Sequence, residues 1–347
     1  METDATMNSL EQQYTDATAE WNCLEQSDIP VFFVGAATCG RAAGAGEVLE
    51  VLRAEISKLG IKAKVIEVGC LGPCYLEPLV IVHKPGAPRI CYGNVGPHQI
   101  LAILHQHVLG SDPCSQWALG VMDAETANGI PKLSDHAVMR HQVRRIFRNC
   151  GIIDPENFHH YLARDGYRGF LRALDIGSEK TLEEVKNSGL RGRGGAGFPT
   201  FKKWEFCRNS PGEKRFLICN CSEGDPGSFM NRTLIEGDPH AVLEGMLIAG
   251  YAMNATAAYI YVGVEYGTVL KRLKLAIKQM REAGLLGENI AGSGFSFDIT
   301  VKRGAGAYVC GEETALIAAI ESRRGMPRPR PPFPAVSVLW GYPTNIQ

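Results

Sequence analysis

The alternation of strand-like and helix-like segments through residues 150–347 constrains the fold more than any other feature. Residues 216–220 and 257–262 are apolar runs typical of buried strands, and residues 295–301 alternate like a half-buried strand. Between the last two, apolar side chains recur at helical spacing through residues 269–280. Strands that alternate with helices predict an α/β domain with a largely parallel sheet.

Two helix starts are marked within this region. Thr181 and Glu184 have the spacing of a capping box, which predicts a helix over about residues 181–188. Asp238 followed by Pro239 predicts the N-cap and the first residue of another helix.

A smaller unit is predicted over residues 30–108. Apolar runs predict strands near residues 31–34, 61–65, 79–82 and 89–92, and helical spacing predicts helices near residues 49–59 and 101–108. Gly60 is placed to end the first helix. The resulting β-α-β-β-β-α order indicates a small sheet with helices packed on it.

Two flanking segments complete the domain organisation. Residues 1–29 are acidic, and residues 1–28 contain no lysine or arginine, so we expect a flexible, poorly packed segment. Residues 109–149 are predicted to be a connector with a basic helix, HQVRRIFRN. Its arginines either lie on a solvated helix face or contact a partner. The larger α/β domain is then expected over residues 150–347.

Composition excludes several classes of function. The formal net charge of −1 gives no electrostatic reason to expect binding to nucleic acid or to an anionic membrane. No apolar run reaches the ~18 residues of a membrane span, and the N-terminus lacks the pattern of a signal peptide. We therefore expect a soluble, cytoplasmic protein without direct membrane insertion, although attachment to a larger complex is compatible with this.

The 11 cysteines fit no secreted disulfide framework, because no secretion signal accompanies them. Isolated cysteines such as Cys23 and Cys207 are interpreted as small core residues. Cys39, Cys70 and Cys74 differ, because each lies next to glycine residues. These three are candidate metal ligands.

A glycine loop, GRGGAG at residues 192–197, is the first candidate ligand site. It follows a predicted helix rather than a strand, so it is not a standard dinucleotide fingerprint, and a structural turn is an equal alternative. Asn220 stands at the carboxyl end of a predicted strand, where open α/β sheets bind ligands. Glu312 and Glu313 begin a predicted helix, and simple helix capping would also explain them.

Four segments together resemble the flavoprotein subunit of the NADH-dehydrogenase family. They are GLRGRGGAGFPTFKKWEF, FLICNCSEGDPGSFMNRTLIEGDPH, GAGAYVCGEETALI and RPRPPFPAVSVLWGYPT, and the resemblance covers about residues 140–347. The family includes the flavoprotein subunit of respiratory complex I and the beta subunits of NAD-linked hydrogenases and formate dehydrogenases. The resemblance implies a Rossmann-like FMN/NADH-binding α/β domain that passes a hydride between NAD(H) and FMN. The alternative is a non-catalytic scaffold subunit derived from this family.

The resemblance also implies roles for individual residues. Gly192, Arg193, Gly194, Gly195 and Ala196 would lie along the flavin, Asn220, Ser222 and Glu223 would hold it from the strand end, and Tyr308, Gly311 and Glu312 would hold it from the opposite side. Phe198, Phe206, Phe333, Asp225 and Glu313 would contact the nicotinamide nucleotide, and the two acids favour NADH over NADPH. Lys203 would hydrogen-bond the flavin ring, and it is expected with Glu313 to act in catalysis. Ser222 stands where the family has Asp, and Phe201 where it has Gly.

Residues 30–108 resemble a thioredoxin-like ferredoxin domain. Cys70 and Cys74 fit its C-x3-C loop, and with Cys39 they would hold a two-iron cluster. The family's second cysteine in the first loop is replaced by Gly44. Three thiolates are one short of the usual four. Either another ligand completes the set, with Cys91 a distant candidate, or the cluster has been lost.

The resemblance places further partners outside this sequence. Family chains continue past the position of Gln347 into a stretch that grips the FMN phosphate and a helical domain with a four-iron cluster. We therefore expect electron transfer with other iron–sulfur subunits of an oxidoreductase complex, and no nucleic-acid partner.

Overall fold

The computed structural model describes residues 2–123, 126–225 and 227–347. Contacts divide the chain into two compact units. Unit 1 comprises Met1–Thr15, Leu162–Ile235 and Pro239–Gln347, and unit 2 comprises Asp16–Tyr161 and Glu236–Asp238. Within the described ranges, no helix has both the length and the apolar character needed to cross a bilayer.

Unit 2 contains a five-stranded sheet in the order β2-β1-β3-β4-β5. Its strands are β1 (Val31–Gly35), β2 (Lys64–Val68), β3 (Val80–His83), β4 (Ile90–Tyr92) and β5 (Ala118–Val121). β1 pairs parallel with β2 and antiparallel with β3, and the β3–β4 and β4–β5 pairs are antiparallel. The order and directions of the first four strands are those of a thioredoxin-like sheet, which confirms the predicted fold class.

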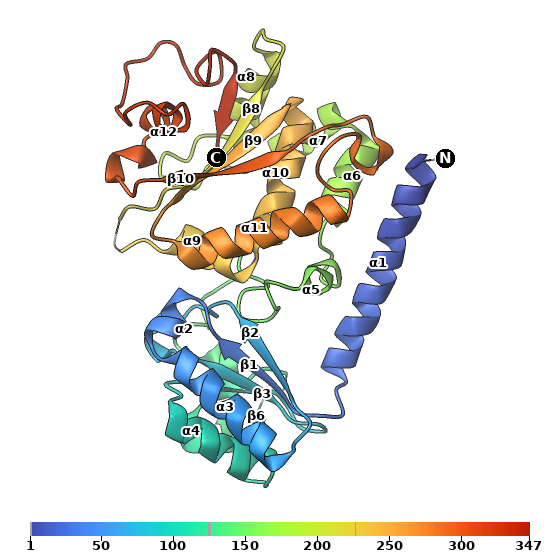
Figure 1. Cartoon of the computed structure of the whole chain (residues 1–347), viewed down its shortest axis with the longest axis vertical. Coiled ribbons are helices and arrows are strands. Elements are labelled where there is room, and N and C mark those ends of the chain that lie inside the picture. The colour runs from blue at the N-terminus through green and yellow to red at the C-terminus, as the bar shows by residue number, and fades with distance from the viewer. Residues whose placement is uncertain (1, 124–125, 226) are drawn as a thin grey trace. The chain divides into compact units, whose positions relative to one another are not determined.

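Helices and short turns surround this sheet (Figure 1). They are α2 (Thr38–Ala42), η1 (Cys74–Leu76), α3 (Ala45–Leu59), α4 (Pro97–Ala102), its π-helical continuation η2 (Ile103–Val108), η3 (Ser115–Trp117), η4 (Leu133–Asp135) and the hairpin β6 (Thr126–Ala127) and β7 (Ile130–Pro131). Leu49 and Leu52 of α3 pack with Phe32 of β1 in one buried cluster. Gly60 ends α3 in the left-handed conformation, with φ of 64°, as its position in the sequence predicts.

Unit 1 contains a four-stranded sheet in the order β10-β9-β8-β11. The strands are β8 (Phe216–Cys221), β9 (Ala257–Gly263), β10 (Ile299–Gly304) and β11 (Thr344–Ile346). All three pairings are parallel, as the alternation of strands and helices predicts. The carboxyl ends of the strands therefore meet at one edge of the sheet.

Helices cover both faces of this parallel sheet. They are α6 (Arg168–Ile176), α7 (Ser178–Asn187), α8 (Thr200–Asn209), α9 (Met230–Gly237), α10 (Pro239–Met253), α11 (Gly267–Glu282) and α12 (Glu313–Ile320), with α5 (Phe158–Leu162) before them and the 3-10 turns η5 (Ile290–Gly292) and η6 (Tyr308–Gly311). Leu316 and Ile317 of α12 pack against Ile218 of β8. Helix α10 contacts β8 and β9, and Figure 1 shows it on the side of the sheet opposite α12.

The N-terminal segment corrects one prediction. Residues 2–25 form a single helix, α1 (Glu2–Glu25), rather than a flexible lead-in. Leu10, Tyr14, Ala17 and Leu24 are buried, and the Tyr14 hydroxyl donates to the Gly166 carbonyl at 2.6 Å. The prediction was wrong because the segment's many acids conceal an apolar stripe at helical spacing.

Thr181 does not begin a helix. Helix α7 starts three residues earlier at Ser178, after the N-cap Gly177, and the Thr181 hydroxyl donates to the Gly177 carbonyl at 2.9 Å. The capping-box prediction was wrong because Thr and Glu three residues apart are equally compatible with a helix interior, where a hydroxyl bonds the preceding turn.

Two other segments differ from their predicted elements. Residues 141–149 form no helix but irregular backbone with turns and bends, and Arg144 donates to the distant Leu71 carbonyl as well as to the carbonyls of Phe147 and Cys150. The strand predicted over residues 295–301 begins only at Ile299, and Phe297 forms an isolated bridge. In both segments, tertiary hydrogen bonds override the local pattern.

Candidate functional site

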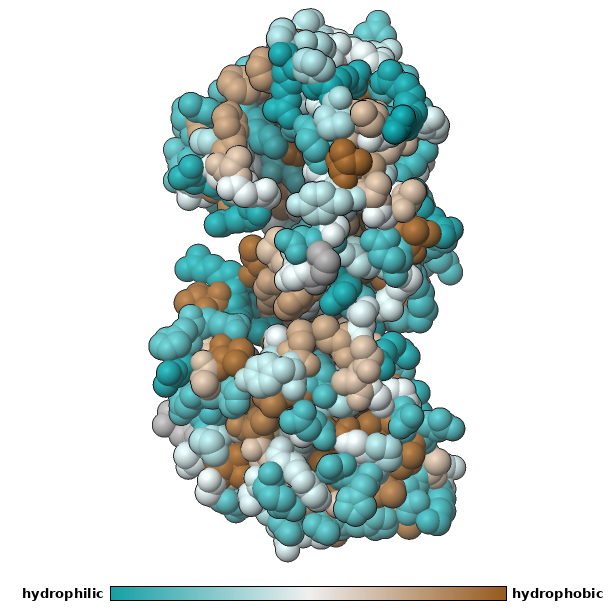
Figure 2. Space-filling model, turned by 90° about the vertical axis from the view of Figure 1, so that its left-hand side faces the viewer, coloured by the Kyte–Doolittle hydropathy of each residue, from teal (hydrophilic) through white to brown (hydrophobic). Residues whose placement is uncertain are grey.

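A cavity of about 980 Å³ opens in unit 1. Three segments form most of its wall: the glycine loop before α8, the carboxyl end of β8 with its following loop, and η6. The predicted residues that line it are Gly192, Arg193, Gly194, Asn220, Ser222, Glu223, Asp225, Tyr308, Gly311 and Glu312. Figure 2 shows a hollow in the surface of the upper part of the molecule, with hydrophobic residues exposed on its rim. The fold therefore brings three of the four motifs to one cavity at the carboxyl edge of the sheet.

The glycines of the glycine loop and of η6 fall into two groups. Gly195 and Gly197 have φ of 116° and 61°, so their backbone conformation itself favours glycine. Gly194 and Gly311 have no positive φ, and a Cβ on either would meet no atom within 4 Å. Neither backbone strain nor packing requires glycine at these two positions. Bare backbone facing a cavity is what a closely approaching ligand requires.

Asn220 ties two parts of the wall together. Its side-chain Nδ2 donates to the Gly311 carbonyl at 3.0 Å, and its Oδ1 accepts from the Ser222 N–H at 3.0 Å. The backbone N–H of Asn220 donates to the Gln347 carbonyl at 2.7 Å. The side chain thus holds η6 and the loop after β8 in a defined relation before any ligand arrives.

Glu223 has a structural task in addition to lining the cavity. Its carboxylate accepts from the N–H groups of Asn231 and Arg232, at 3.0 and 3.1 Å, and from the Ser228 hydroxyl at 2.9 Å. It therefore satisfies N–H groups at the start of α9, where backbone donors lack partners within the helix. Asp225 is exposed, and its side chain accepts a local bond from the Gly227 N–H.

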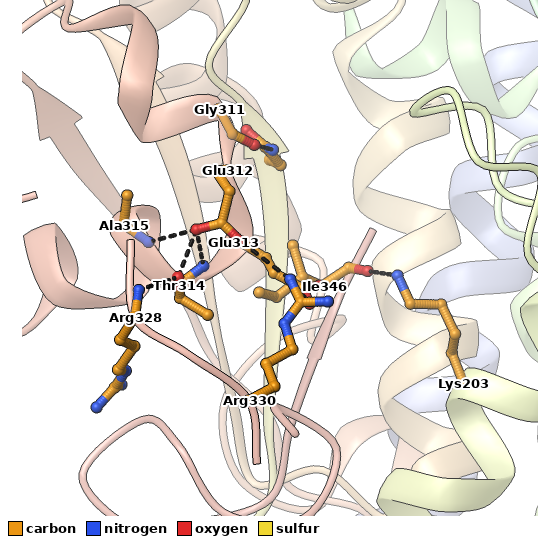
Figure 3. Close-up of polar contacts among 10 residues, drawn as sticks. Lys203, Gly311, Glu312, Glu313, Thr314, Ala315, Arg328, Arg330 and Ile346 are labelled. Carbon is orange, nitrogen blue, oxygen red and sulfur yellow. Dashed lines mark hydrogen bonds and ion pairs between the residues drawn. The ribbon is translucent and has the colours of Figure 1, made fainter. Parts of the chain in front are cut away.

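Glu312 and Glu313 share an arginine (Figure 3). Arg330 Nη2 lies 2.9 Å from Glu312 Oε1 and 2.6 Å from Glu313 Oε1. Glu312 is also the N-cap of α12, because its Oε2 accepts from the N–H groups of Thr314 and Ala315. Burial acts to raise the pKa of Glu312, but the bonds from Thr314, Ala315 and Arg330 hold it below its usual value. Helix capping is thus confirmed for Glu312.

We expect Glu312→Ala to destabilise unit 1 by about 1–2 kcal/mol, because it removes the cap of α12. Glu313→Ala removes only an ion pair to the same arginine and should cost less than about 1 kcal/mol. Chemical denaturation of the two variants measures the difference. Equal losses would show that the contact with Arg330, rather than the cap, carries the stability.

Lys203 points toward Ile346 of the C-terminal strand β11 (Figure 3). Its Nζ donates to the Ile346 carbonyl at 2.7 Å. Burial lowers the pKa of this ammonium group, while the negative charge of Glu313 acts in the opposite direction. The ammonium group therefore feels the charge of Glu313, while its hydrogen bond goes to a neutral carbonyl.

Several predicted site residues do not line the cavity. They are Gly195, Ala196, Phe198, Lys203, Phe206, Glu313 and Phe333. The three phenylalanines have exposed side chains, at 43%, 51% and 56% of full exposure respectively. Exposed aromatic rings beside a cavity are available to stack on a planar ligand.

The apolar floor of the cavity was missed from the sequence. Val242, Met246 and Ala249 of α10 line it, together with Trp204 and Leu217. The spacing i, i+4, i+7 in α10 marks one helix face, but the same stripe is typical of an ordinary core helix. Only the tertiary structure, which places this face of α10 along the cavity, distinguishes a cavity-lining helix from an ordinary core helix.

A second candidate site lies in unit 2. The Sγ atoms of Cys39, Cys70 and Cys74 all lie within 4.8 Å of one another, with 3.5 Å between the last two. Hydrogen bonding from Cys39 raises the pKa of Cys74 to about 11, and burial adds to the rise. The raised pKa favours the protonated form of the Cys74 thiol, whose proton a bound metal ion would displace. Cys91 does not belong to this group among the described residues.

A parallel α/β sheet with a glycine-walled cavity at its carboxyl edge defines a nucleotide-cofactor domain. Comparison with known proteins specifies the class, because residues 185–345 match the family model described as the Nuo51 FMN-binding domain. The match covers the segment that contains the four motifs, and it confirms the resemblance found in them.

Relatives support the same assignment. The HndC subunit of the NADP-reducing hydrogenase of Solidesulfovibrio fructosivorans is 53% identical over 205 residues, which is 59% of this chain and 42% of that protein. The mitochondrial NADH dehydrogenase (ubiquinone) flavoprotein 1 of Dictyostelium discoideum is 48% identical over 187 residues, 53% of this chain and 39% of that protein. This chain thus spans less than half the length of both. The structure of an NAD+-reducing [NiFe]-hydrogenase in the H2-reduced state aligns with a TM-score of 0.50 and 27% identity, over 91% of this chain and 50% of that chain.

Proposed function

We propose that this chain is the NADH-oxidising, or NAD-reducing, flavoprotein part of a multi-subunit electron-transfer complex. The observation that carries the proposal is the cavity in unit 1, because the wall that it presents comes from three motif segments of an FMN-binding domain family. The volume of about 980 Å³ suits a flavin mononucleotide with part of a second nucleotide.

The residues of the wall fit a flat, polar ring system. The bare backbone of Gly194 and Gly311 leaves room for a ligand, and Asn220 holds the Gly311 backbone to the end of β8. Arg193 adds a positive charge to the lining. When bound, FMN would supply a centre that exchanges a hydride with NAD(H) and releases electrons singly to iron–sulfur clusters.

In such a reaction, the main task of the protein is to orient the nicotinamide nucleotide against the flavin. Holding two reactants in a productive geometry can remove roughly 7–11 kcal/mol of a barrier. Phe198, Phe206 and Phe333 would stack on the nicotinamide nucleotide, and Asp225 would bond its hydroxyl or amide groups. Glu313 would do so together with Arg330, its ion-pair partner.

The thiol group of unit 2 is proposed to hold a two-iron cluster in this electron path. Three converging thiols in a thioredoxin-like unit are a suitable donor set, since iron–sulfur clusters are held by thiolates. Other iron–sulfur subunits, including a carrier of a four-iron cluster, would be the electron partners of the chain.

A spectroscopic titration tests the proposal. We expect the purified chain to bind FMN rather than FAD, seen as quenching of flavin fluorescence, and NADH to bleach the bound flavin anaerobically. NADPH should act less efficiently, because Asp225 and Glu313 disfavour a 2′-phosphate. Absence of FMN binding would support the scaffold alternative, and equal kcat/KM for the two nucleotides would contradict the proposed roles of the acids.

A further inference from the structure

Two cysteines of β8 stand side by side at the carboxyl end of the parallel sheet. The Sγ atoms of Cys219 and Cys221 lie 3.5 Å apart. Residues two positions apart in a strand point to the same face of its sheet. Leu217 and Cys219 line the cavity, whereas Ile218 packs against α12 on the opposite face. The two thiols therefore lie on the face of the sheet that borders the cavity.

The two thiols differ in their access to that cavity. Cys219 is partly exposed and belongs to the described lining, whereas Cys221 is only 4% exposed and does not belong to it. The hydrogen bond with Cys219 raises the pKa of Cys221, and burial adds to the rise. The thiolate is the nucleophilic form of cysteine, so burial and a raised pKa make Cys221 slow to react by itself. A reagent that enters the cavity therefore meets Cys219 first, with the Cys221 thiol beside it.

The pair suits a disulfide better than a metal ion. Among the described residues, no third cysteine, histidine or carboxylate joins these two thiols in a metal-type group, whereas a structural zinc site takes four ligands. A disulfide needs only two cysteines whose Cα atoms are about 4.4–6.8 Å apart, and two residues of a strand span about 6.6 Å. Cys221 is the last residue of β8, so the adjustment that brings the sulfur atoms into bonding distance falls at the end of the strand.

We propose that Cys219 and Cys221 form a thiol-oxidation site in the wall of the cavity, which a small disulfide of the glutathione class converts into an intramolecular disulfide. The site goes beyond the proposed function, because its chemistry uses only the chain's own thiols and one external disulfide. Nothing in it depends on the binding of FMN or NADH. Because Cys219 is part of the lining, the bridge would change the shape of the cavity wall.

The reaction is thiol–disulfide exchange in two steps. The Cys219 thiolate attacks one sulfur atom of the small disulfide, forms a mixed disulfide and releases one small thiol. Cys221 then attacks the Cys219 sulfur of that mixed disulfide, which closes the bridge and releases the second small thiol. Together the two protein thiols lose two electrons and two protons, and the small disulfide gains both.

Tryptic cleavage isolates this pair, which allows a direct test on the full chain. The peptide of residues 216–232 contains Cys219 and Cys221 and no other cysteine. The folded, reduced chain is incubated anaerobically with oxidised glutathione, then denatured, alkylated, digested and analysed by mass spectrometry. The peptide should lose two hydrogens and resist alkylation, and dithiothreitol should restore both thiols.

Cys207 is the internal control of the same digest, because it is buried in α8 and lies in a separate peptide, residues 204–208. The bridge in residues 216–232 should form at least about 10-fold faster than Cys207 becomes modified, because the reactivity of a cysteine follows its exposure and thiolate character.

Two variants separate the roles of the two cysteines, and thermal unfolding verifies that each variant folds. Cys221→Ala should stop at the mixed disulfide, so its peptide gains one glutathione that dithiothreitol removes. Cys219→Ala should leave Cys221 free for alkylation after denaturation, because its thiol is buried in the folded chain. The wild-type measurement needs no substitution, so the test stands even if a variant misfolds. Two free thiols in the wild-type peptide after the incubation, or glutathione on both cysteines, would overturn the proposal whether or not the chain binds FMN.

Discussion

Replacing Gly194 by valine should lower the affinity of the chain for FMN about 10- to 100-fold while unit 1 remains folded. A Cβ at this position meets no protein atom within 4 Å, so we expect the folded protein to accept the side chain. A ligand lying against this backbone would meet the new methyl groups, and overpacking of this kind costs roughly 1–3 kcal/mol. Gly311→Val should act in the same way from the other side of the cavity.

Gly267→Val is the matched control for both glycine variants. Gly267 begins α11 in the same unit, is exposed, has no positive φ and also leaves a Cβ without contacts. It does not line the cavity. Fluorescence titration with FMN and thermal unfolding are measured for all three variants. Wild-type FMN affinity in Gly194→Val and Gly311→Val would show that no ligand approaches these two backbones.

Lys203→Met should reduce the rate of NADH oxidation by bound FMN about 10²- to 10³-fold. Removal of one preorganised electrostatic contact to developing charge has effects of this size. The ammonium group is partly buried and is held by a single neutral carbonyl, that of Ile346. In contact with a bound flavin ring, the ammonium group would exchange this one bond to a neutral carbonyl for a contact with the ring.

The adjacent Lys202 provides the control. It is exposed on the same helix, α8, and Lys202→Met should leave the rate near the wild-type value. A purely structural role for Lys203 would appear as lost thermal stability, whereas electrostatic stabilisation predicts a more negative reduction potential of the bound flavin. An unchanged potential together with an unchanged rate would remove Lys203 from the catalytic machinery.

Much of the architecture was predictable because it depends on local patterns. The apolar runs at β8 and β9 and the helical face of α11 reflect burial on a sheet and under a helix, and periodicity reports such burial directly. The three motif segments that line the cavity were identified from their glycines and polar residues and from their resemblance to a family. Their unusual residues, such as Gly194 and Asn220, stand out against the regular elements around them.

The class of each unit, the parallel sheet and the residues of the glycine loop follow from the order of the amino acids alone, because these features depend on neighbours within a few positions. Other features depend on residues that are distant in the sequence, and these became visible only in the tertiary structure. Folding made residues 2–25 a packed helix, joined Glu312 and Glu313 to Arg330, placed a face of α10 along the cavity and brought the thiols of Cys39, Cys70 and Cys74 together. Hydrogen bonds, charge pairing and burial act through space, so a carboxylate in a chain has no assigned partner until folding brings one within reach.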